Sequence, residues 1–156
     1  MGPLVADRRL EVMEDFISDA ISSGGEIISG GGRGQSPGSF FEPTLIRDVP
    51  DTAKIMIEEP FGPVAPSASF SSIDEIIERA NSLPFGLASY AFTSNPRTSQ
   101  ILKSEIESGM LAINSMHIHS VETPFGGLKH SGYGYEGSIE GLEAFLVTKY
   151  SSEIYT

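Results

Sequence analysis

Apolar positions near the start of the chain recur at the spacing of a helix. Between Asp7 and the Gly24–Gly25 pair, apolar side chains fall three or four residues apart, with acidic residues between them. That spacing places the apolar side chains on one face of a helix. Asp7 is a plausible N-cap, and the glycine pair is a plausible stop. The apolar face of the predicted helix consists of Leu10, Met13, Phe16, Ile17, Ala20 and Ile21.

Beyond this helix, short apolar runs alternate with further helical patterns. Strands are expected at 26–29, which reads as buried, at 40–49 with a break at Pro43, at 63–70, at 87–93 and at 110–114. One or two helical turns are expected within 51–59, and a short helix at 139–145. Alternation at this rhythm favours parallel strand pairing, so the predicted class is an α/β layer fold.

Two further helices carry start signals. Ser72 and Glu75 form the Ser-x-x-Glu pattern of a capping box, directly ahead of an apolar helical stripe. Asn95 is a cap residue, and Pro96 follows it at the first helical position, where proline is well tolerated. We expect the second of these helices to end before Gly109.

Composition and charge narrow the classes of function. The chain has 156 residues, 39% of them hydrophobic, which suits one domain with a core. A net charge of −11 without any basic run argues against a nucleic-acid partner. The chain contains no apolar stretch of the ~20 residues that a membrane span requires and no signal-peptide pattern at its start. The expected location is therefore the cytoplasm.

Cysteine is absent from the 156 residues. This absence removes disulfides, thiolate metal ligands and cysteine nucleophiles together. Two histidines remain as candidate chemistry, because His117 and His119 stand at the i, i+2 spacing of one strand face, with Glu122 nearby. A third metal ligand is not obvious, so we expect the two imidazoles to line a pocket or loop rather than to hold a metal.

A glycine-rich stretch, PFGGLKHSGYG at 124–134, follows the histidines. So many glycines indicate a backbone that approaches something closely, either a ligand or a neighbouring element. Phe125, set between proline and paired glycines, is a candidate pocket wall.

The heptad EEPFGPV, at 58–64, combines two carboxylates, an aromatic ring and two prolines. Each proline restricts itself and the residue before it, so the backbone here is stiff. Such a loop can hold the Glu59 carboxylate and the Phe61 ring in a fixed relation. A carboxylate that accepts from a sugar diol, beside a ring that faces a planar heterocycle, would suit a nucleotide. The alternative is a helix end with solvated acids.

Four stretches in order, EEPFGPV, LPFGLASYAFT, GMLAIN and PFGGLKHSGYGYEG, resemble the aldehyde dehydrogenase superfamily. GPLV near the start and FFEPTLIRDVP fit the same family, so the resemblance covers nearly the whole chain. VETPFGG together with GLEAFLVTKY is most similar to the succinate-semialdehyde dehydrogenase-like branch. The resemblance implies the C-terminal part of a catalytic domain with a parallel, three-layer α/β architecture at 1–145, and an oligomerisation strand at 146–156.

The resemblance also implies an activity. The family oxidises an aldehyde to an acid with NAD or NADP: a cysteine thiolate forms a thiohemiacetal, and hydride then leaves to the nicotinamide. Glu59 matches the glutamate that binds the nicotinamide ribose, and Phe61 matches the aromatic residue beside the nicotinamide ring. Phe125 matches a substrate-tunnel aromatic, while His117 and His119 fall in a substrate-facing loop. A homo-oligomer and a small aldehyde are the implied partners.

Departures from the family pattern limit what this chain can do alone. No residue matches the catalytic cysteine, so we expect no catalytic residue in this chain, weak or no cofactor binding, and no activity in isolation. Tyr135 stands where the family usually has arginine, and His119 where succinate-semialdehyde enzymes carry a serine. Two alternatives remain: a non-catalytic oligomerisation or interaction protein derived from the family, and a different small enzyme that uses His117, His119 and Glu122.

Overall fold

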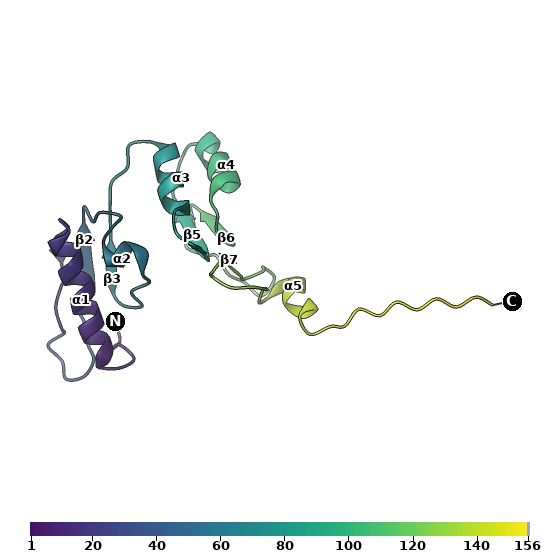
Figure 1. Cartoon of the computed structure of the whole chain (residues 1–156), viewed down its shortest axis with the longest axis horizontal. Coiled ribbons are helices and arrows are strands. Elements are labelled where there is room, and N and C mark those ends of the chain that lie inside the picture. Colours follow the sequence, from purple (N-terminus) through teal and green to yellow (C-terminus); the bar gives the residue numbers. More distant parts are fainter. Residues whose placement is uncertain (156) are drawn as a thin grey trace. The chain divides into compact units, whose positions relative to one another are not determined.

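Five helices and seven strands alternate along residues 1–155, the part of the chain that this computed structural model describes (Figure 1). The chain is therefore α/β, as the alternating pattern predicts. It divides into two compact units, Met1–Ser71 and the segment from Ser72 onward. Within residues 1–155, no helix is both long and apolar enough to cross a membrane.

The first unit consists of two helices and a three-stranded sheet. Its elements are α1 (Arg8–Ser22), β1 (Glu26–Ser29), β2 (Thr44–Arg47), α2 (Lys54–Ile57) and β3 (Val64–Pro66). The sheet order is β1-β2-β3, with β1 antiparallel to β2 and β2 parallel to β3. Because α2 lies between two parallel strands in sequence, β2, α2 and β3 form one βαβ connection.

The core of the first unit lies under the apolar face of α1. The predicted positions of that helix are buried, except Ile21, which is exposed. One hydrophobic cluster is completed by residues from β2, α2 and β3 and from the segments before and after β2. The cluster consists of Leu10, Met13, Phe16, Ile17, Ala20, Phe41, Ile46, Val49, Ala53, Ile55 and Val64.

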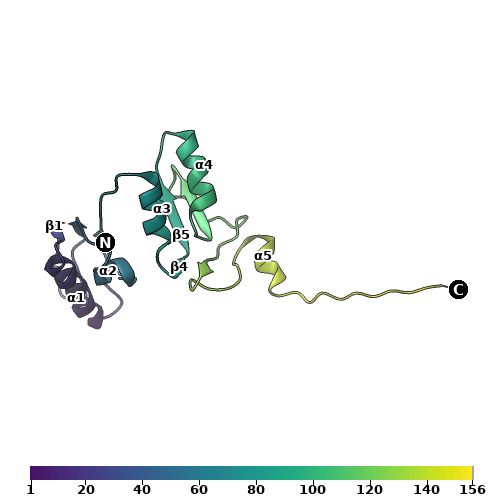
Figure 2. The same ribbon diagram turned by 45° about the horizontal axis from the view of Figure 1, so that its top comes forward.

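The second unit contains two separate pairs of strands. Its elements are α3 (Ile73–Asn81), β4 (Phe85–Gly86), β5 (Ala88–Ala91), α4 (Pro96–Glu105), β6 (Met110–Ile113), β7 (Leu128–Lys129) and α5 (Ser138–Glu143). β5 and β6 pair in parallel across α4, whereas β4 and β7 pair antiparallel. Helices α3 and α4 lie side by side next to the β5–β6 pair (Figure 2).

Both predicted helix starts of the second unit are confirmed. The Glu75 N–H donates to the Ser72 hydroxyl at 3.1 Å. The Asn95 side chain accepts from the N–H groups of Arg97 and Thr98, directly around Pro96. These bonds satisfy donors that every helix N-terminus leaves without an internal partner.

Four expectations from the sequence differ from the structure. Asp7 does not cap α1 with its side chain; its backbone is already helical, and its carboxylate accepts from Ser39 Oγ instead. Strand β1 is exposed rather than buried, because it is an edge strand with β2 as its one neighbour. Pairing is mixed rather than parallel throughout. Strand β7 lies within the glycine-rich 124–134, where no strand was predicted.

Residues 146–155 form no strand within this chain; they continue after α5 as an exposed extended segment (Figure 1). A strand forms only where its N–H and C=O groups find a neighbouring edge. The expected pairing of this segment with a neighbouring subunit stays a prediction, as does the domain boundary at 145 and 146.

Candidate functional site: the EEPFGPV loop and the glycine-rich loop

The EEPFGPV heptad forms the connection between α2 and β3. Helix α2 ends at Ile57, and Glu58 is already extended, with φ −109° and ψ 140°. The Thr44 N–H donates to the Pro63 carbonyl at 2.8 Å, and the Val64 N–H donates to the Gly62 carbonyl at 2.9 Å. The end of the loop is thus joined to β2 as β3 begins. The stiffness that the two prolines predict is therefore reinforced by backbone hydrogen bonds.

Phe61 has an unusual backbone and an exposed ring. Its φ is +42°, in the left-handed region that non-glycine residues rarely adopt. The residue is 75% exposed. A large apolar side chain in a strained conformation that buries little of its surface gains nothing for the stability of this chain. An outlier of this kind supports a role for the ring in contact with something outside the chain.

Glu59 directly precedes this strained turn and is exposed. Among residues 1–155, no group forms a hydrogen bond or ion pair with its carboxylate. The carboxylate is therefore available to accept from hydroxyl groups, such as the diol of a ribose. An available carboxylate and an exposed ring two residues apart on a stiff loop fit the nicotinamide half of NAD or NADP.

The second group of candidate residues lies in the second unit. The rings of His119 and Phe125 meet edge to face, with centroids 5.2 Å apart and an angle of 82° between their planes. Phe125 is half-buried and forms an isolated antiparallel bridge with Glu136, in which each N–H donates to the other carbonyl at 2.8 Å. The structure thus brings two of the predicted pocket residues into direct contact.

His117 is exposed, and its backbone N–H donates to the Ser115 hydroxyl at 2.9 Å. No ring contact joins it to His119 or Phe125 within the described residues. Glu122 lies nearby in sequence, and its hydrogen bond with Ser120 lowers the pKa of its carboxyl group. Residues 1–155 contain no cluster of three or more His, Asp or Glu side chains that could hold a metal ion.

Two of the four glycines of 124–134, Gly126 and Gly127, approach other atoms closely, whereas a Cβ at Gly132 or Gly134 would meet nothing within 4 Å. A Cβ at Gly126 would lie 2.5 Å from Tyr135 Cδ1 and 2.6 Å from the Gly134 carbonyl oxygen. A Cβ at Gly127 would lie 2.5 Å from the Ser131 Cβ. The backbone of Gly126 and Gly127 therefore approaches the later part of the same stretch closely.

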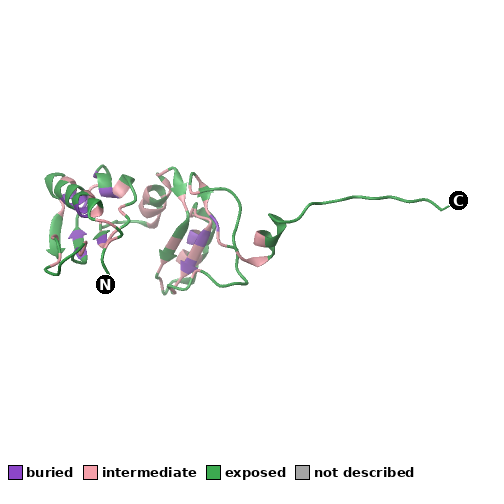
Figure 3. Cartoon of the chain, turned by 90° about the horizontal axis from the view of Figure 1, so that it is seen from below, coloured by how far each residue is buried: buried purple, intermediate pink, exposed green. Residues whose placement is uncertain are grey.

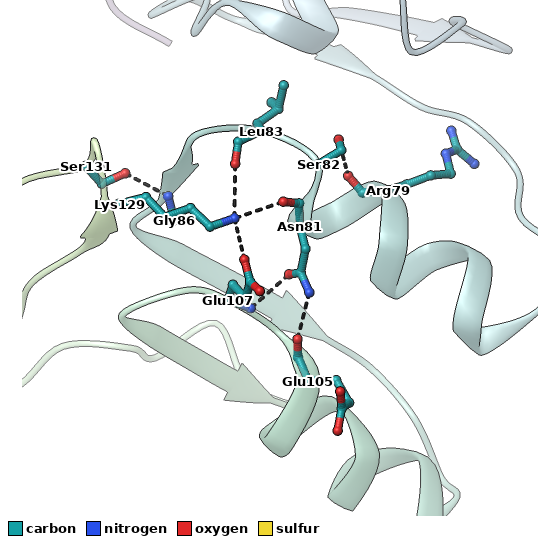
Figure 4. Close-up of polar contacts among 9 residues, drawn as sticks. All are labelled: Arg79, Asn81, Ser82, Leu83, Gly86, Glu105, Glu107, Lys129 and Ser131. Atoms are coloured by element: carbon teal, nitrogen blue, oxygen red, sulfur yellow. Dashed lines mark hydrogen bonds and ion pairs between the residues drawn. The ribbon is translucent and has the colours of Figure 1, made fainter.

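Lys129 is a residue whose role sequence reasoning missed. Its Nζ donates to the carbonyls of Asn81 and Leu83 at 2.8 and 3.1 Å, and pairs with Glu107 at 2.6 Å (Figure 4). Asn81 in turn accepts from the Glu107 N–H and donates to the Glu105 carbonyl. This network joins the ends of α3 and α4 to β7. The one available signal was a lysine inside a glycine-rich stretch, which is too common to predict three acceptors.

A model of the aldehyde dehydrogenase family matches residues 1–151. The chain belongs to the aldehyde dehydrogenase family. The resemblance that rests on EEPFGPV, LPFGLASYAFT, GMLAIN and PFGGLKHSGYGYEG is thereby confirmed.

Two relatives show which members of the aldehyde dehydrogenase family this chain is similar to. 4-(Hydroxymethyl)benzenesulfonate dehydrogenase TsaD1 of Comamonas testosteroni is 43% identical over 150 residues, which cover 96% of this chain and 31% of that protein. A probable succinate-semialdehyde dehydrogenase (NADP+) of Sinorhizobium fredii is also 43% identical, with 96% of this chain and 30% of that protein covered. This chain is thus similar to succinate-semialdehyde dehydrogenases, in agreement with VETPFGG and GLEAFLVTKY.

A solved structure shows the same fold. The succinate-semialdehyde dehydrogenase from Burkholderia pseudomallei superimposes with a TM-score of 0.92 at 36% identity, over 94% of this chain and 30% of that chain. The chain therefore has the fold of part of an aldehyde dehydrogenase, and it spans about 30% of the length of the curated relatives it matches.

Proposed function

We propose that these residues work as part of an NAD(P)-dependent aldehyde dehydrogenase that oxidises an aldehyde to a carboxylic acid. The observation that carries the proposal is the pairing of the available Glu59 carboxylate with the strained, 75% exposed Phe61 on one stiff loop. Family membership gives that pair a ligand of matching chemistry, a nicotinamide cofactor.

In this proposal the EEPFGPV loop binds the nicotinamide half of the cofactor. The Glu59 carboxylate accepts from the ribose hydroxyls, and the Phe61 ring contacts the nicotinamide plane. NAD or NADP, when bound, supplies the hydride acceptor for the oxidation. The residues of this chain orient the cofactor and exclude water from one side of it, and they contribute no proton transfer at this loop.

The edge-to-face pair of His119 and Phe125, with His117 two residues away, forms part of the substrate pocket. Imidazole rings can donate to an anionic group, so this wall suits an aldehyde that carries a second, negatively charged end, such as a semialdehyde. The thiolate that forms the thiohemiacetal comes from outside these 156 residues, because they contain no cysteine. The isolated chain is therefore inactive and binds the cofactor weakly.

The same proposal includes a cytoplasmic location and a homo-oligomer. Residues 146–155 expose Leu146, Val147, Tyr150 and Tyr155 along an extended segment that has no strand neighbour in this chain. An edge of this kind favours pairing with another chain. The segment would then act as the oligomerisation strand of the assembly.

A non-catalytic interaction protein is the second candidate. The absence of cysteine within the 156 residues and the many exposed large hydrophobic side chains favour it. It differs from the first candidate in one measurable respect, because it would show no aldehyde-dependent reduction of NAD or NADP at any length of the polypeptide.

The test uses the native-length protein, meaning the polypeptide at the length that source cells make. Initial rates of aldehyde oxidation are followed at increasing NAD or NADP, with succinate semialdehyde held at saturation. Glu59→Gln should raise the KM for the cofactor about tenfold, while kcat falls less, because a lost charge-assisted hydrogen bond weakens binding by that order. Glu58→Gln, which removes the adjacent exposed carboxylate, is the matched control and should leave the KM unchanged. Equal effects of the two variants would contradict the assignment of Glu59.

A further inference from the structure

The strained turn at Phe61 needs support from outside the loop. A non-glycine residue at φ +42° relaxes unless its neighbours fix it. The ring itself cannot supply that support, because 75% of the residue is exposed. The contacts of the two residues that flank Phe61 therefore decide what holds the turn.

Arg9 contacts the residue before Phe61. Arg9 lies in the first turn of α1, and its Nη2 donates to the carbonyl oxygen of Pro60. Pro60 stands directly between Glu59 and Phe61. One guanidinium group thus fixes the peptide that joins the two candidate cofactor residues.

Met13 contacts the residue after Phe61. Met13 is fully buried, and a Cβ at Gly62 would overlap its sulfur atom. Gly62 therefore packs its bare Cα onto this side chain. Because Arg9 and Met13 are four residues apart in α1, they share one helix face. That face holds the turn on both sides of Phe61.

The buried Nε of Arg9 indicates that this side chain does not serve stability alone. Its Nε is buried, and no group in residues 1–155 accepts a hydrogen bond from it. A buried donor without an acceptor lowers stability, so an apolar side chain would serve folding at least as well here. A residue that costs stability while it fixes a strained turn is typical of a functional site.

We propose that Arg9, with Met13 beneath Gly62, is a positioning residue that holds Glu59 and Phe61 in the geometry that binds the nicotinamide cofactor. This inference rests on the proposed function, and it adds that α1, a helix with no candidate ligand contact of its own, sets the cofactor affinity. Arg9 acts through the Pro60 peptide and does not contact the cofactor.

The first test measures how readily the turn at Phe61 opens, in the absence of cofactor. In the native-length protein, chymotrypsin cleavage after Phe61 is followed by mass spectrometry, with cleavage after the exposed Phe145 as internal reference. Arg9→Met should raise the Phe61 rate at least about fivefold, because cleavage follows the population of the opened loop. Arg8→Met is the matched control: it removes the same charge from the next position of α1, where Arg8 is exposed and has no partner among the described residues. It should leave the rate unchanged.

The second test measures cofactor affinity directly, by fluorescence titration with NADH and NADPH. Arg9→Met should weaken binding about tenfold, and Arg8→Met should not, which separates loop positioning from long-range attraction to the cofactor phosphates. Arg9→Lys retains one donor for the Pro60 carbonyl and should restore most of both signals. It also provides a folded comparison if Arg9→Met lowers the yield.

The outcomes separate the two proposals. Equal Phe61 cleavage in Arg9→Met and Arg8→Met would overturn the positioning role of Arg9. Faster cleavage with unchanged affinity for both cofactors would overturn the link between α1 and the cofactor, and with it the assignment of Glu59 and Phe61 in the proposed function. Faster cleavage together with weaker binding, restored in Arg9→Lys, is the result that supports both.

Discussion

The two units of the chain bury their hydrophobic residues very differently (Figure 3). Met1–Ser71 closes one continuous cluster in which Met13 and Ile46 are fully buried. From Ser72 to Tyr155, the buried hydrophobic side chains are only Leu102, Met110 and Ala112. Large side chains such as Phe92 and Tyr133 stay exposed in this second unit. The first unit therefore has its own core, whereas the second leaves apolar surface without a cover.

An amphipathic sequence pattern predicts a helix with an apolar face, but it does not predict which surface packs against that face. Helix α1 buries its apolar face against the sheet of its own unit. Helix α3 has an equally regular pattern and a better cap, yet none of its residues is buried. Contiguous exposed apolar surface usually marks a contact with another part or partner. The second unit is thus the part whose stability depends most on what surrounds it.

The largest expected difference comes from truncating one isoleucine in each unit, a buried one in the first unit and an exposed one in the second. Ile46→Ala in the first unit should lower the free energy of unfolding by about 2–5 kcal/mol, because it leaves a cavity at a fully buried site. Ile154→Ala, at an 85% exposed position, should change it by less than about 0.5 kcal/mol. Urea denaturation followed by circular dichroism measures both. Similar losses would refute the difference in packing.

Self-association is the next largest expected effect. The uncovered surface and the 146–155 segment should make the chain associate as its concentration rises, which light scattering across a concentration series detects. Tyr150→Asp should weaken association by about 2 kcal/mol, since exposed aromatic residues contribute most to such contacts. Phe61→Asp, at another exposed aromatic position but in the first unit, is the control. A concentration-independent monomer would contradict this expectation.

Within the second unit, polar contacts replace part of the missing core. Asn81→Ala removes its hydrogen bonds to the Glu105 carbonyl and from the Glu107 N–H, 2.7 and 2.9 Å long. We expect the free energy of unfolding to fall by about 1–2 kcal/mol. Faster hydrogen exchange in β5 and β6, with unchanged exchange in β2, would locate the effect in this unit. Equal acceleration in both units would argue for one cooperative structure instead.

The smallest expected effect concerns pH and the surface of the first unit. Two hydrogen bonds from Arg33, 2.6 and 2.8 Å long, lower the pKa of Glu14 below its ordinary value of 4.5. A lowered folded-state pKa stabilises the fold above pH 4.5, and this contribution is lost as the pH falls through the lower value. Glu14→Gln should therefore lower the Tm slightly at pH 7, and by less as the pH falls below 4.5 toward pH 3. A larger difference at pH 3 would give the wrong sign.

Local signals predicted most of the elements. The spacing of Leu10 to Ala20, the Ser72 cap and the Asn95-Pro96 start each depend on a few neighbouring residues, and the structure has all three elements. Features that depend on distant residues were missed. Asp7 accepts from Ser39 rather than capping its own helix, and Lys129 finds its two carbonyl acceptors more than forty residues away.

For the candidate site, the residues that form the loop were easier to predict than the contacts that hold the loop in place. The prolines around Phe61 indicate a stiff loop, and the structure has one. The positive φ of Phe61 and the Arg9 contact depend on how α1 packs against the α2–β3 connection. The contact of His119 with Phe125 likewise crosses a turn that no local pattern describes. The assignment of these residues to cofactor and substrate stays a prediction.

The central claim, that this segment acts in an aldehyde dehydrogenase together with a cysteine supplied from outside it, has one direct test. An antibody against these residues recovers the native polypeptide from source cells, and its mass and its aldehyde-dependent reduction of NAD and NADP are measured on the same material. We expect a band several times larger than 16.7 kDa, with an activity that is lost on thiol alkylation. A single band at 16.7 kDa without activity would contradict it and favour the non-catalytic interaction protein.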